Sequence, residues 1–334
     1  MERPPIFKVA IADFICGSTE PEESILRDLA AVEALNGFCE ADLIGRIDDA
    51  DAVILFHNLS LTAQTIQRLH RCKVIVRAGV GYDNVDRQLA RQRGIPVCNV
   101  PDYGTEEVAD SAIGLMLSLT RGTHLYNSIL RDAPQELWSY QQSVPLRRLR
   151  GRTFGILGLG RIGSATALRA KALGMDVLFY DPYVADGVDK SLGIRRAESL
   201  GQLLTQSFVL SVHVPLTGET RGMIDADAIM QMQAGSYLIN TARGAVVDTA
   251  AIPNAIASGR LAGAAIDVLE QEPPAADNPL LVAWRDPNHP AHHRAIINPH
   301  AAFYSEEGFL DMRTKSADAC RRALLGLPLR NVVN

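Results

Sequence analysis

The sequence predicts an α/β fold built from two doubly wound parallel sheets. Along most of the chain, short apolar runs alternate with segments whose apolar residues recur at helical spacing, which is typical of parallel strands joined by helices. The 334 residues are 47% hydrophobic and 21% charged, which is enough apolar material for two packed domains and too much for a disordered chain. We therefore expect two domains, each with its own sheet.

The first hundred residues are expected to form the smaller sheet. Predicted strands cover residues 7–11, 52–56, 74–76 and 96–98. Predicted helices cover residues 22–34 and 61–69 and a segment that ends at Arg93. The first of these helices would place Leu26, Leu29 and Val32 on one apolar side. This part of the sequence carries no phosphate-binding glycine loop.

A cluster of helix-breaking residues, Asn99-Val-Pro101-Asp-Tyr-Gly104, marks the end of this first domain. Thr105 can cap a long helix that runs to Arg121, and a second helix is expected at 125–132. The long helix carries more apolar residues than one packed face requires, and we therefore expect a homodimer.

The stretch from Thr153 to Asp181 has the pattern of a dinucleotide-binding unit. An apolar strand leads into Gly158-Leu-Gly160-Arg-Ile-Gly163, and a helix and a second strand follow. The glycines allow a tight turn, close approach of a pyrophosphate and close packing, while the helix N-terminus offers N–H groups to the phosphates. Asp181 can accept hydrogen bonds from ribose hydroxyls and would repel a 2'-phosphate, so NAD is predicted rather than NADP.

Later strands, predicted at 209–212, 237–240, 264–266 and 295–297, lead into polar residues. A helix is expected at 249–258, and a terminal helix at 305–325. Ligands of an open parallel sheet lie beyond the carboxyl ends of its strands, so these polar residues are candidates for a site: His213, Arg243, Asp267 and His300.

Arg243, Glu272 and His300 have the side-chain types that a 2-hydroxy-acid dehydrogenase needs. Arginine can bind a carboxylate, histidine can move the hydroxyl proton, and glutamate can orient and charge the histidine. Each residue alone also fits a structural role, as a surface ion-pair partner, a loop acid and a cap respectively. Their occurrence together beside a dinucleotide turn favours catalysis.

Composition argues against several other classes. The net charge of −5 gives no basic footprint for nucleic acid, and the sequence shows neither a signal peptide nor an apolar run long enough for a membrane helix, so a cytoplasmic protein is expected. Five widely spaced cysteines predict reduced, mostly buried thiols rather than disulfides or structural zinc: Cys16, Cys39, Cys72, Cys98 and Cys320.

Motifs occur in order along the chain: the glycine turn, His213-Val-Pro-Leu-Thr217, Asn240-Thr-Ala-Arg243-Gly244, Ala265-Ile-Asp267-Val with Glu272-Pro273, and Asn298-Pro-His300-Ala. In this order they resemble the motifs of the D-isomer-specific 2-hydroxyacid dehydrogenases. Further stretches resemble the C-terminal-binding-protein branch and phosphoglycerate-dehydrogenase-like enzymes: Ile75-Val-Arg77-Ala-Gly79, Val97-Cys-Asn-Val-Pro101 and His300-Ala-Ala-Phe-Tyr-Ser305.

The resemblance implies a flavodoxin-like substrate domain at 1–101, completed by 300–334, and a Rossmann NAD domain at 102–299. It implies Arg243, Glu272 and His300 as the catalytic residues. The implied cofactor contacts are Gly158, Gly160, Arg161, Ile162, Gly163, Asp181, His213, Val214, Pro215, Thr220, Thr241, Ala242 and Asp267, the last beside the nicotinamide amide. The implied substrate contacts are Arg77, Val80, Gly81, Arg243 and His300.

Two departures from the family pattern bear on function. Phe303 stands where the animal corepressors carry tryptophan, so their pocket size does not transfer. The loop before His300, at 284–294, contains His289, His292 and His293, for which we expect no metal. The sequence therefore predicts an NAD-dependent reductase that acts on a small 2-keto acid. An NAD-sensing, peptide-binding protein of the corepressor type is the alternative.

Overall fold

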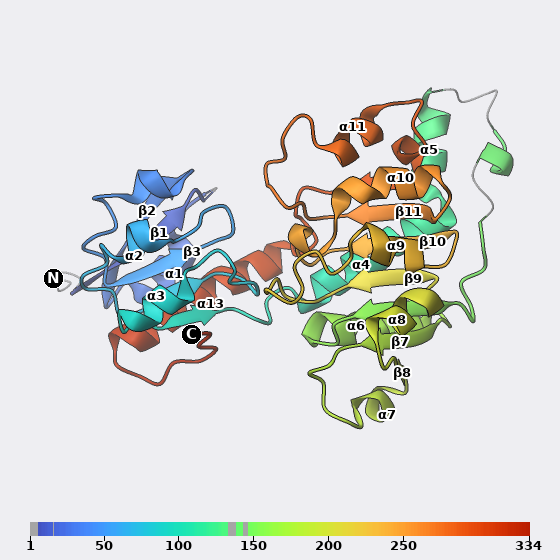
Figure 1. Ribbon diagram of the computed structural model, residues 1–334. Coiled ribbons are helices and arrows are strands. Elements are labelled where there is room, and N and C mark those ends of the chain that lie inside the picture. The colour runs from blue at the N-terminus through green and yellow to red at the C-terminus, as the bar shows by residue number, and fades with distance from the viewer. Residues whose placement is uncertain (1–5, 16, 133–137, 143–145) are drawn as a thin grey trace. The chain divides into compact units, whose positions relative to one another are not determined.

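The structure is a computed structural model and describes residues 6–15, 17–132, 138–142 and 146–334. The chain divides into two compact units (Figure 1). Unit 1 comprises Met1–Gly104 and Tyr304–Asn334, and unit 2 comprises Thr105–Phe303. Each unit contains a parallel sheet with helices against it, which confirms the predicted α/β class.

Unit 1 has a five-stranded parallel sheet in the order β2-β1-β3-β4-β5. The strands are β1 (Phe7–Asp13), β2 (Ala30–Gly37), β3 (Ala52–Leu55), β4 (Ile75–Arg77) and β5 (Val97–Asn99). The helices are α1 (Glu20–Leu26), η1 (Glu40–Leu43), α2 (Ala63–Ile66), α3 (Arg87–Gln92) and α13 (Glu306–Leu324). Helix α13 packs on β3 and β4, so the end of the chain completes this unit.

The helix predicted at 22–34 is wrong, because α1 ends at Leu26 and β2 begins at Ala30. Alanine, leucine and glutamate in this stretch favour a helix by propensity. The backbone instead pairs in parallel with β1 over most of its length, from Phe7 opposite Ala30 onward, and its side chains alternate between buried and more exposed positions. Tertiary pairing at the edge of the sheet has therefore overridden local preference.

The beginning and end of unit 1 are joined by a buried ion pair. Arg313 on α13 donates from Nε to Oε1 of Glu22 at 2.7 Å and from a terminal nitrogen to Oε2 at 2.5 Å. The two residues are 5% and 0% exposed. Bidentate geometry of this kind satisfies both charges away from water and fixes α1 against α13.

Unit 2 has a seven-stranded parallel sheet in the order β12-β11-β10-β9-β6-β7-β8. The strands are β6 (Thr153–Leu157), β7 (Asp176–Tyr180), β8 (Arg195–Arg196), β9 (Val209–Val212), β10 (Ser236–Asn240), β11 (Leu261–Ile266) and β12 (Ala295–Ile297). Strand β6 lies between β7 and β9, so the order of the strands reverses there. Such a switch point is where open α/β sheets bind ligands.

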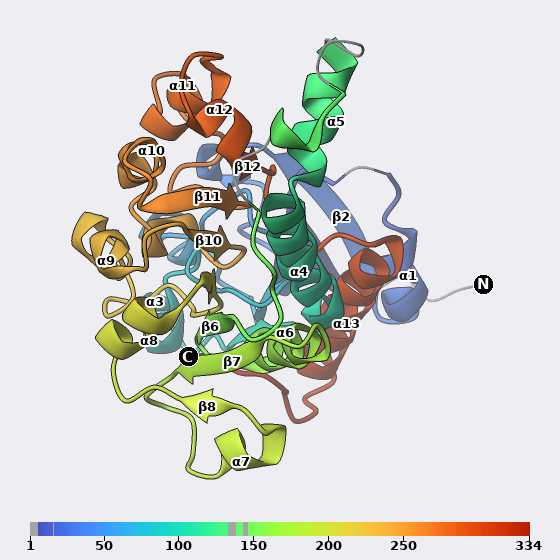
Figure 2. The ribbon, with the colours of Figure 1, turned by 90° about the vertical axis from the view of Figure 1, so that its right-hand side faces the viewer.

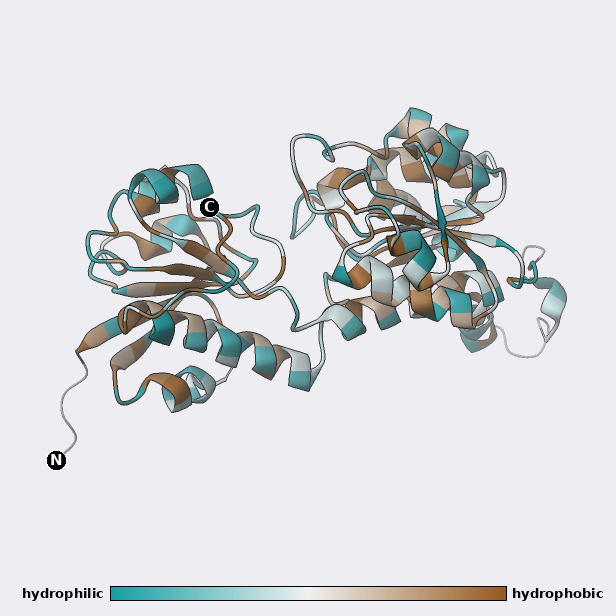
Figure 3. Ribbon diagram, turned by 90° about the horizontal axis from the view of Figure 1, so that it is seen from below, coloured by the Kyte–Doolittle hydropathy of each residue, from teal (hydrophilic) through white to brown (hydrophobic). Residues whose placement is uncertain are grey.

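Helices cover both faces of this sheet. The helices of unit 2 are α4 (Thr105–Arg121), α5 (Thr123–Asp132), α6 (Arg161–Ala172), α7 (Val188–Leu192), α8 (Leu200–Gln206), α9 (Ala226–Gln231), α10 (Ile252–Ala257), α11 (Pro279–Arg285) and α12 (Ala291–Arg294), with short turns η2 (Tyr140–Gln142), η3 (Gly244–Val246) and η4 (Thr249–Ala251). Figure 2 shows α4 and α6 side by side on one face and α8, α9 and α10 on the other. The apolar strands lie between them (Figure 3).

The prediction that the cysteines are mostly buried thiols has a mixed outcome. Among the described residues, Cys72, Cys98 and Cys320 are at least partly buried free thiols, whereas Cys39 is exposed, and Cys16 lies outside them. Burial raises the pKa of the Cys72 thiol to about 12 and that of the Cys98 thiol to about 11.

No described helix is long and apolar enough to cross a membrane. The described histidines, cysteines and carboxylates form no group of three or more that is arranged to hold a metal ion.

Candidate active site

The glycine turn joins β6 to α6 at the switch point of the larger sheet. Gly158 has a φ of +91°, and a Cβ there would lie 2.8 Å from Val214 Cγ1 and 3.0 Å from the backbone of His213. A Cβ on Gly163 would lie 2.1 Å from the carbonyl oxygen of Gly158. A Cβ on Gly160 would meet nothing within 4 Å. Two glycines are thus required by packing, and the third leaves open space before the α6 N-terminus, where a pyrophosphate fits.

Asp181 follows β7 and is tied to this turn. Its Oδ2 accepts the Leu159 N–H at 2.9 Å, and its Oδ1 accepts the Tyr183 N–H at 2.9 Å. Each carboxylate oxygen retains a second lone pair for a ribose hydroxyl. Arg196 on β8 donates to backbone carbonyls of the loop after β7, and its guanidinium lies over the ring of Phe179. The residues at this strand end therefore fit the diol of NAD.

The loop after β9 is held by side-chain hydrogen bonds that the sequence did not reveal. Thr220 donates its hydroxyl to the carbonyl of Pro215 at 2.6 Å and accepts the Thr217 N–H at 2.8 Å. The Tyr183 hydroxyl donates to Glu219, which connects the loops after β7 and β9. Tyr183 and Glu219 are 36 residues apart, so only the fold brings them together.

His213 stands at the end of β9. Its backbone N–H donates to the Leu157 carbonyl at 2.8 Å, and its Nε2 lies 2.8 Å from the Ser211 hydroxyl. Burial lowers the pKa of His213 to about 4. The imidazole is therefore neutral near pH 7, so His213 offers a hydrogen-bonding group rather than a positive charge.

Asn240 organises the turn that carries Arg243. Its side chain accepts the Ala242 N–H at 3.0 Å and donates to the Arg243 carbonyl at 3.0 Å. Next to it, the Thr241 hydroxyl is buried and has no hydrogen-bond partner among the described residues. A buried hydroxyl of this kind suits a ligand group, so this turn also fits a bound dinucleotide.

Asp267 follows β11 and holds the loop that carries His300. It is 1% exposed, and its carboxylate accepts the N–H groups of Ala301 at 2.9 Å and Ala302 at 3.1 Å. The His300 N–H donates to the Asp267 carbonyl at 2.7 Å. Burial raises the pKa of Asp267, although the two N–H groups oppose this. The observed contacts make Asp267 a positioning residue for the loop.

Glu272 and His300 form a direct pair. His300 Nδ1 lies 2.7 Å from Glu272 Oε2, and Glu272 Oε1 accepts the Leu269 N–H at 2.7 Å. The His300 side chain is 19% exposed and that of Glu272 is 32% exposed, so both remain accessible. His300 has a left-handed φ of 53°, which costs a non-glycine residue free energy and is maintained here by the Asp267 contacts. Phe303 packs edge-on against the imidazole, with ring centroids 6.2 Å apart.

Arg243 lies in the same unit as this pair, and its guanidinium donates to the Ala242 carbonyl at 2.8 Å. The remaining cofactor candidates are Arg161, which is exposed at the start of α6, and Ile162, which is half-buried.

The predicted substrate contacts Arg77, Val80 and Gly81 belong to unit 1. Arg77 is 5% exposed, and its guanidinium contacts the amide oxygen of Asn84 at 3.4 Å. A Cβ on Gly79 would lie 1.7 Å from that guanidinium, so the glycine makes room for it. The Val80 carbonyl accepts a hydrogen bond from the side-chain amide of Asn99. The observed contacts of Arg77 are structural, and its role toward a substrate stays a prediction.

Taken together, the parallel sheet, the glycine turn and the strand-end polar residues define a dinucleotide-binding α/β protein. Residues 113–302 match the sequence profile of the D-isomer specific 2-hydroxyacid dehydrogenase, NAD binding domain. The chain belongs to this family, and NAD is its cofactor.

Relatives place the chain near the phosphoglycerate-dehydrogenase-like branch. It is 34% identical over 310 residues to the D-3-phosphoglycerate dehydrogenase of Methanocaldococcus jannaschii, covering 93% of this chain and 56% of that protein. It is 36% identical over 327 residues to the same enzyme of Archaeoglobus fulgidus, covering 98% and 59%. The chain thus spans less than two thirds of the length of these curated relatives.

Solved structures share the fold over nearly the whole chain. The D-lactate dehydrogenase of Aquifex aeolicus, complexed with NAD and lactic acid, is 29% identical with a TM-score of 0.84, over 95% of this chain and 96% of that one. A protein of Thermus thermophilus is 31% identical with a TM-score of 0.84, over 98% and 100%.

Proposed function

We propose that this chain interconverts a 2-keto acid and a D-2-hydroxy acid by NAD-dependent hydride transfer. The observation that carries the proposal is the 2.7 Å contact between His300 Nδ1 and Glu272 Oε2, in the unit that also holds the glycine turn. Enzymes with related sequences are named D-3-phosphoglycerate dehydrogenase and D-lactate dehydrogenase. Neither the geometry nor these relatives favour the peptide-binding alternative.

The residues of this chain supply the proton and the substrate clamp. Bound NADH supplies a hydride to the keto carbon. With Nδ1 engaged by Glu272, His300 delivers a proton from Nε2 to the carbonyl oxygen, and the carboxylate fixes the orientation of the imidazole for this step. Arg243 binds the substrate carboxylate through paired N–H groups. We assign residues 1–101 with 300–334 to substrate binding, through Arg77 and the backbone of Val80 and Gly81, and residues 102–299 to NAD.

The test is turnover with NADH across a panel of 2-keto acids that includes phosphorylated and phosphonylated members. We expect reduction of at least one member and the D enantiomer as product. Absence of turnover across the panel, with NADH binding retained, would contradict the proposal and favour the peptide-binding alternative.

Asp181 leads us to propose a preference for NADH over NADPH of at least about tenfold, equivalent to about 1.4 kcal/mol. The carboxylate is fixed beside the glycine turn by two backbone N–H groups, where it would repel a 2'-phosphate. Comparison of kcat/KM for the two cofactors, in the parent and in Asp181→Ala, measures this. Equal efficiency in the parent would overturn the assignment.

We also propose a homodimer, although the structure changes the argument for it. Most apolar residues of α4 are buried within unit 2, and Ile113 and Leu117 remain only partly covered. Trp138 and Tyr140, which follow α5, are 78% and 81% exposed. Sedimentation at micromolar concentration should show the dimer, and a monomer throughout would rule it out.

A further inference from the structure

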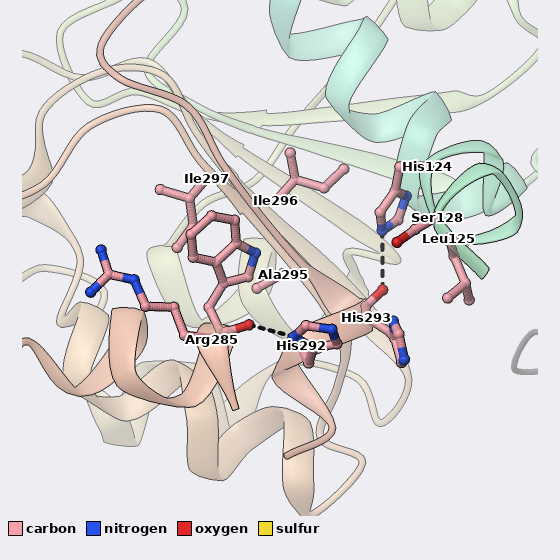
Figure 4. Close-up of a pocket in the computed structure, with 10 residues that line it drawn as sticks. His124, Leu125, Ser128, Arg285, His292, His293, Ala295, Ile296 and Ile297 are labelled. Atoms are coloured by element: carbon pink, nitrogen blue, oxygen red, sulfur yellow. Dashed lines mark hydrogen bonds between the residues drawn. The ribbon is translucent and has the colours of Figure 1, made fainter. Parts of the chain in front are cut away.

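A cavity of about 450 Å³ lies at the outer edge of the larger sheet, where β12 is the terminal strand. Figure 4 shows residues of α5 on one side and residues of α11, α12 and β12 on the other. The lining residues are His124, Leu125, Ser128, Trp284, Arg285, His292, His293, Ala295, Ile296 and Ile297. None of the candidate catalytic or cofactor residues lines this cavity.

The lining combines basic side chains with an apolar wall. Arg285 and three histidines are among the described residues that line the cavity, and none of these described residues is an aspartate or a glutamate. Among the described residues, no acidic side chain forms an ion pair with Arg285. Ile296 and Ile297 supply an apolar wall, and the half-buried indole of Trp284 adds an aromatic surface. A guanidinium beside apolar and aromatic walls suits an anion with an apolar body.

Two of the histidines are fixed by hydrogen bonds before any ligand binds. His124 Nδ1 lies 3.0 Å from the carbonyl oxygen of Ser118, and its Nε2 lies 3.0 Å from the carbonyl oxygen of His293. The second contact joins α5 to α12 (Figure 4). His292 Nδ1 lies 2.8 Å from the Trp284 carbonyl, and its ring packs edge-on against that of His293 at 4.6 Å. The walls are therefore largely pre-formed, which lowers the cost of binding.

Basic side chains surround His293. Burial lowers the pKa of His293, and the neighbouring His292, His124 and Arg294 lower it further, as a cluster of basic groups does. A second cavity of about 290 Å³ shares Leu125 and His293 with the first, and the part of its lining that the structure describes also contains no acidic residue. Both cavities would attract negative charge.

We propose that the cavity between α5, α11, α12 and β12 binds a small organic anion, with a carboxylate or phosphate beside Arg285 and an apolar body against Trp284 and Ile296. Its volume lies within the range of about 300–1,000 Å³ that is usual for small-molecule sites. The site is separate from the candidate active site, and the inference does not depend on the proposed reaction.

The chain offers a direct reporter, because its two tryptophans are Trp138 and Trp284. In Trp138→Phe, the remaining indole lines the cavity, and its fluorescence can be titrated with 4-phenylbutyrate, phenyl phosphate and the neutral 4-phenylbutanamide. We expect saturable changes with the two anions, with Kd of about 1 mM or tighter, and binding of the amide at least about tenfold weaker. The two anions distinguish a carboxylate from a phosphate ligand.

Substitutions in the same background locate the site. Arg285→Gln combined with His293→Gln should weaken binding of the anions at least about tenfold. Arg195→Gln is the matched control, because Arg195 is an exposed arginine on β8 at the opposite edge of the same sheet, and it should leave binding unchanged.

Four results would overturn the inference. The first is the absence of a saturable change with either anion, and the second is equal binding of the amide. The third is loss of binding in Arg243→Gln but not in the Arg285 and His293 variant, because that result would place the anion in the candidate active site. The fourth is a fluorescence change that follows protein concentration and not ligand, which would show that a second copy of the chain covers the cavity.

Discussion

Asp13 in unit 1 and Asp267 in unit 2 occupy comparable positions, each at the end of a strand and each almost fully buried. Asp13 accepts N–H groups from a loop of its own unit, at 2.7 Å from Phe56, 3.0 Å from Asn58 and 3.2 Å from Leu59. Asp267 accepts N–H groups from the loop that carries His300. Burial raises the pKa of both carboxyls.

The two regions differ in the further contacts of the loop whose N–H groups donate to the buried aspartate. In unit 1, Asn84 donates to the carbonyls of Phe56 and Leu59, so an amide side chain secures the same loop a second time. In unit 2, the loop presents His300 in a left-handed conformation to the accessible carboxylate of Glu272. A buried carboxylate with a raised pKa therefore does not mark an active site by itself, and the proposed function rests on the accessible pair of His300 and Glu272 beside it.

The largest expected effect is the loss of the proton donor. His300→Ala should reduce kcat by about 10²- to 10⁴-fold, because a positioned general acid contributes about that much. If His300 were only a cap after Pro299, the variant would lose stability and keep its rate. Kinetics and melting temperatures of His300→Ala, with the exposed His70→Ala as a control, separate the two roles.

The two strand-end carboxylates can be compared directly. Asp267→Asn should lower kcat about tenfold to a hundredfold, because loss of a charged hydrogen bond of about 1.5–3 kcal/mol loosens the His300 loop. Asp13→Asn should cost a similar free energy of unfolding and leave kcat of the folded protein unchanged. Equal losses of kcat in both variants would contradict the distinction between the regions.

His213, at a third strand end, should make stability depend on pH. Its pKa falls from 6.5 to about 4 on folding, so the unfolded chain binds a proton that the folded chain does not. Unfolding free energy should therefore decrease as pH falls from 6.5 to 4, by about 1.4 kcal/mol per pH unit and roughly 3 kcal/mol in all. Denaturant titrations at pH 7 and pH 4.5 should show a smaller decrease in His213→Gln, and an unchanged one would refute the assignment.

The smallest effect concerns the accessible pair. Glu272→Gln replaces the carboxylate that holds His300 Nδ1 with a neutral amide, so kcat of reduction should fall while NADH affinity stays nearly constant. The fall should be about threefold to tenfold, because the weaker hydrogen bond would cost up to about 1.4 kcal/mol. Steady-state kinetics that show an unchanged kcat in Glu272→Gln would mean that the two side chains do not act together.

Local sequence was sufficient for much of unit 2. The turn with Gly158, Gly160 and Gly163 was recognisable because its conformation and close packing need glycine. Asp181 was recognisable because it follows an apolar strand. Strands β6 and β9 and the helices α4 and α6 were predicted closely, since their apolar residues keep a regular spacing. These features depend on residues that are near one another in the chain.

The tertiary structure decided what depends on distant residues. Residues 30–37 became a strand because β1 was available to pair with them. His300 and Glu272 are 28 residues apart, so the sequence could suggest their chemistry but not their 2.7 Å contact. His292 and His293 likewise line a cavity because α5 lies against α12 through His124. Local spacing predicts elements, whereas contacts between elements require the folded chain.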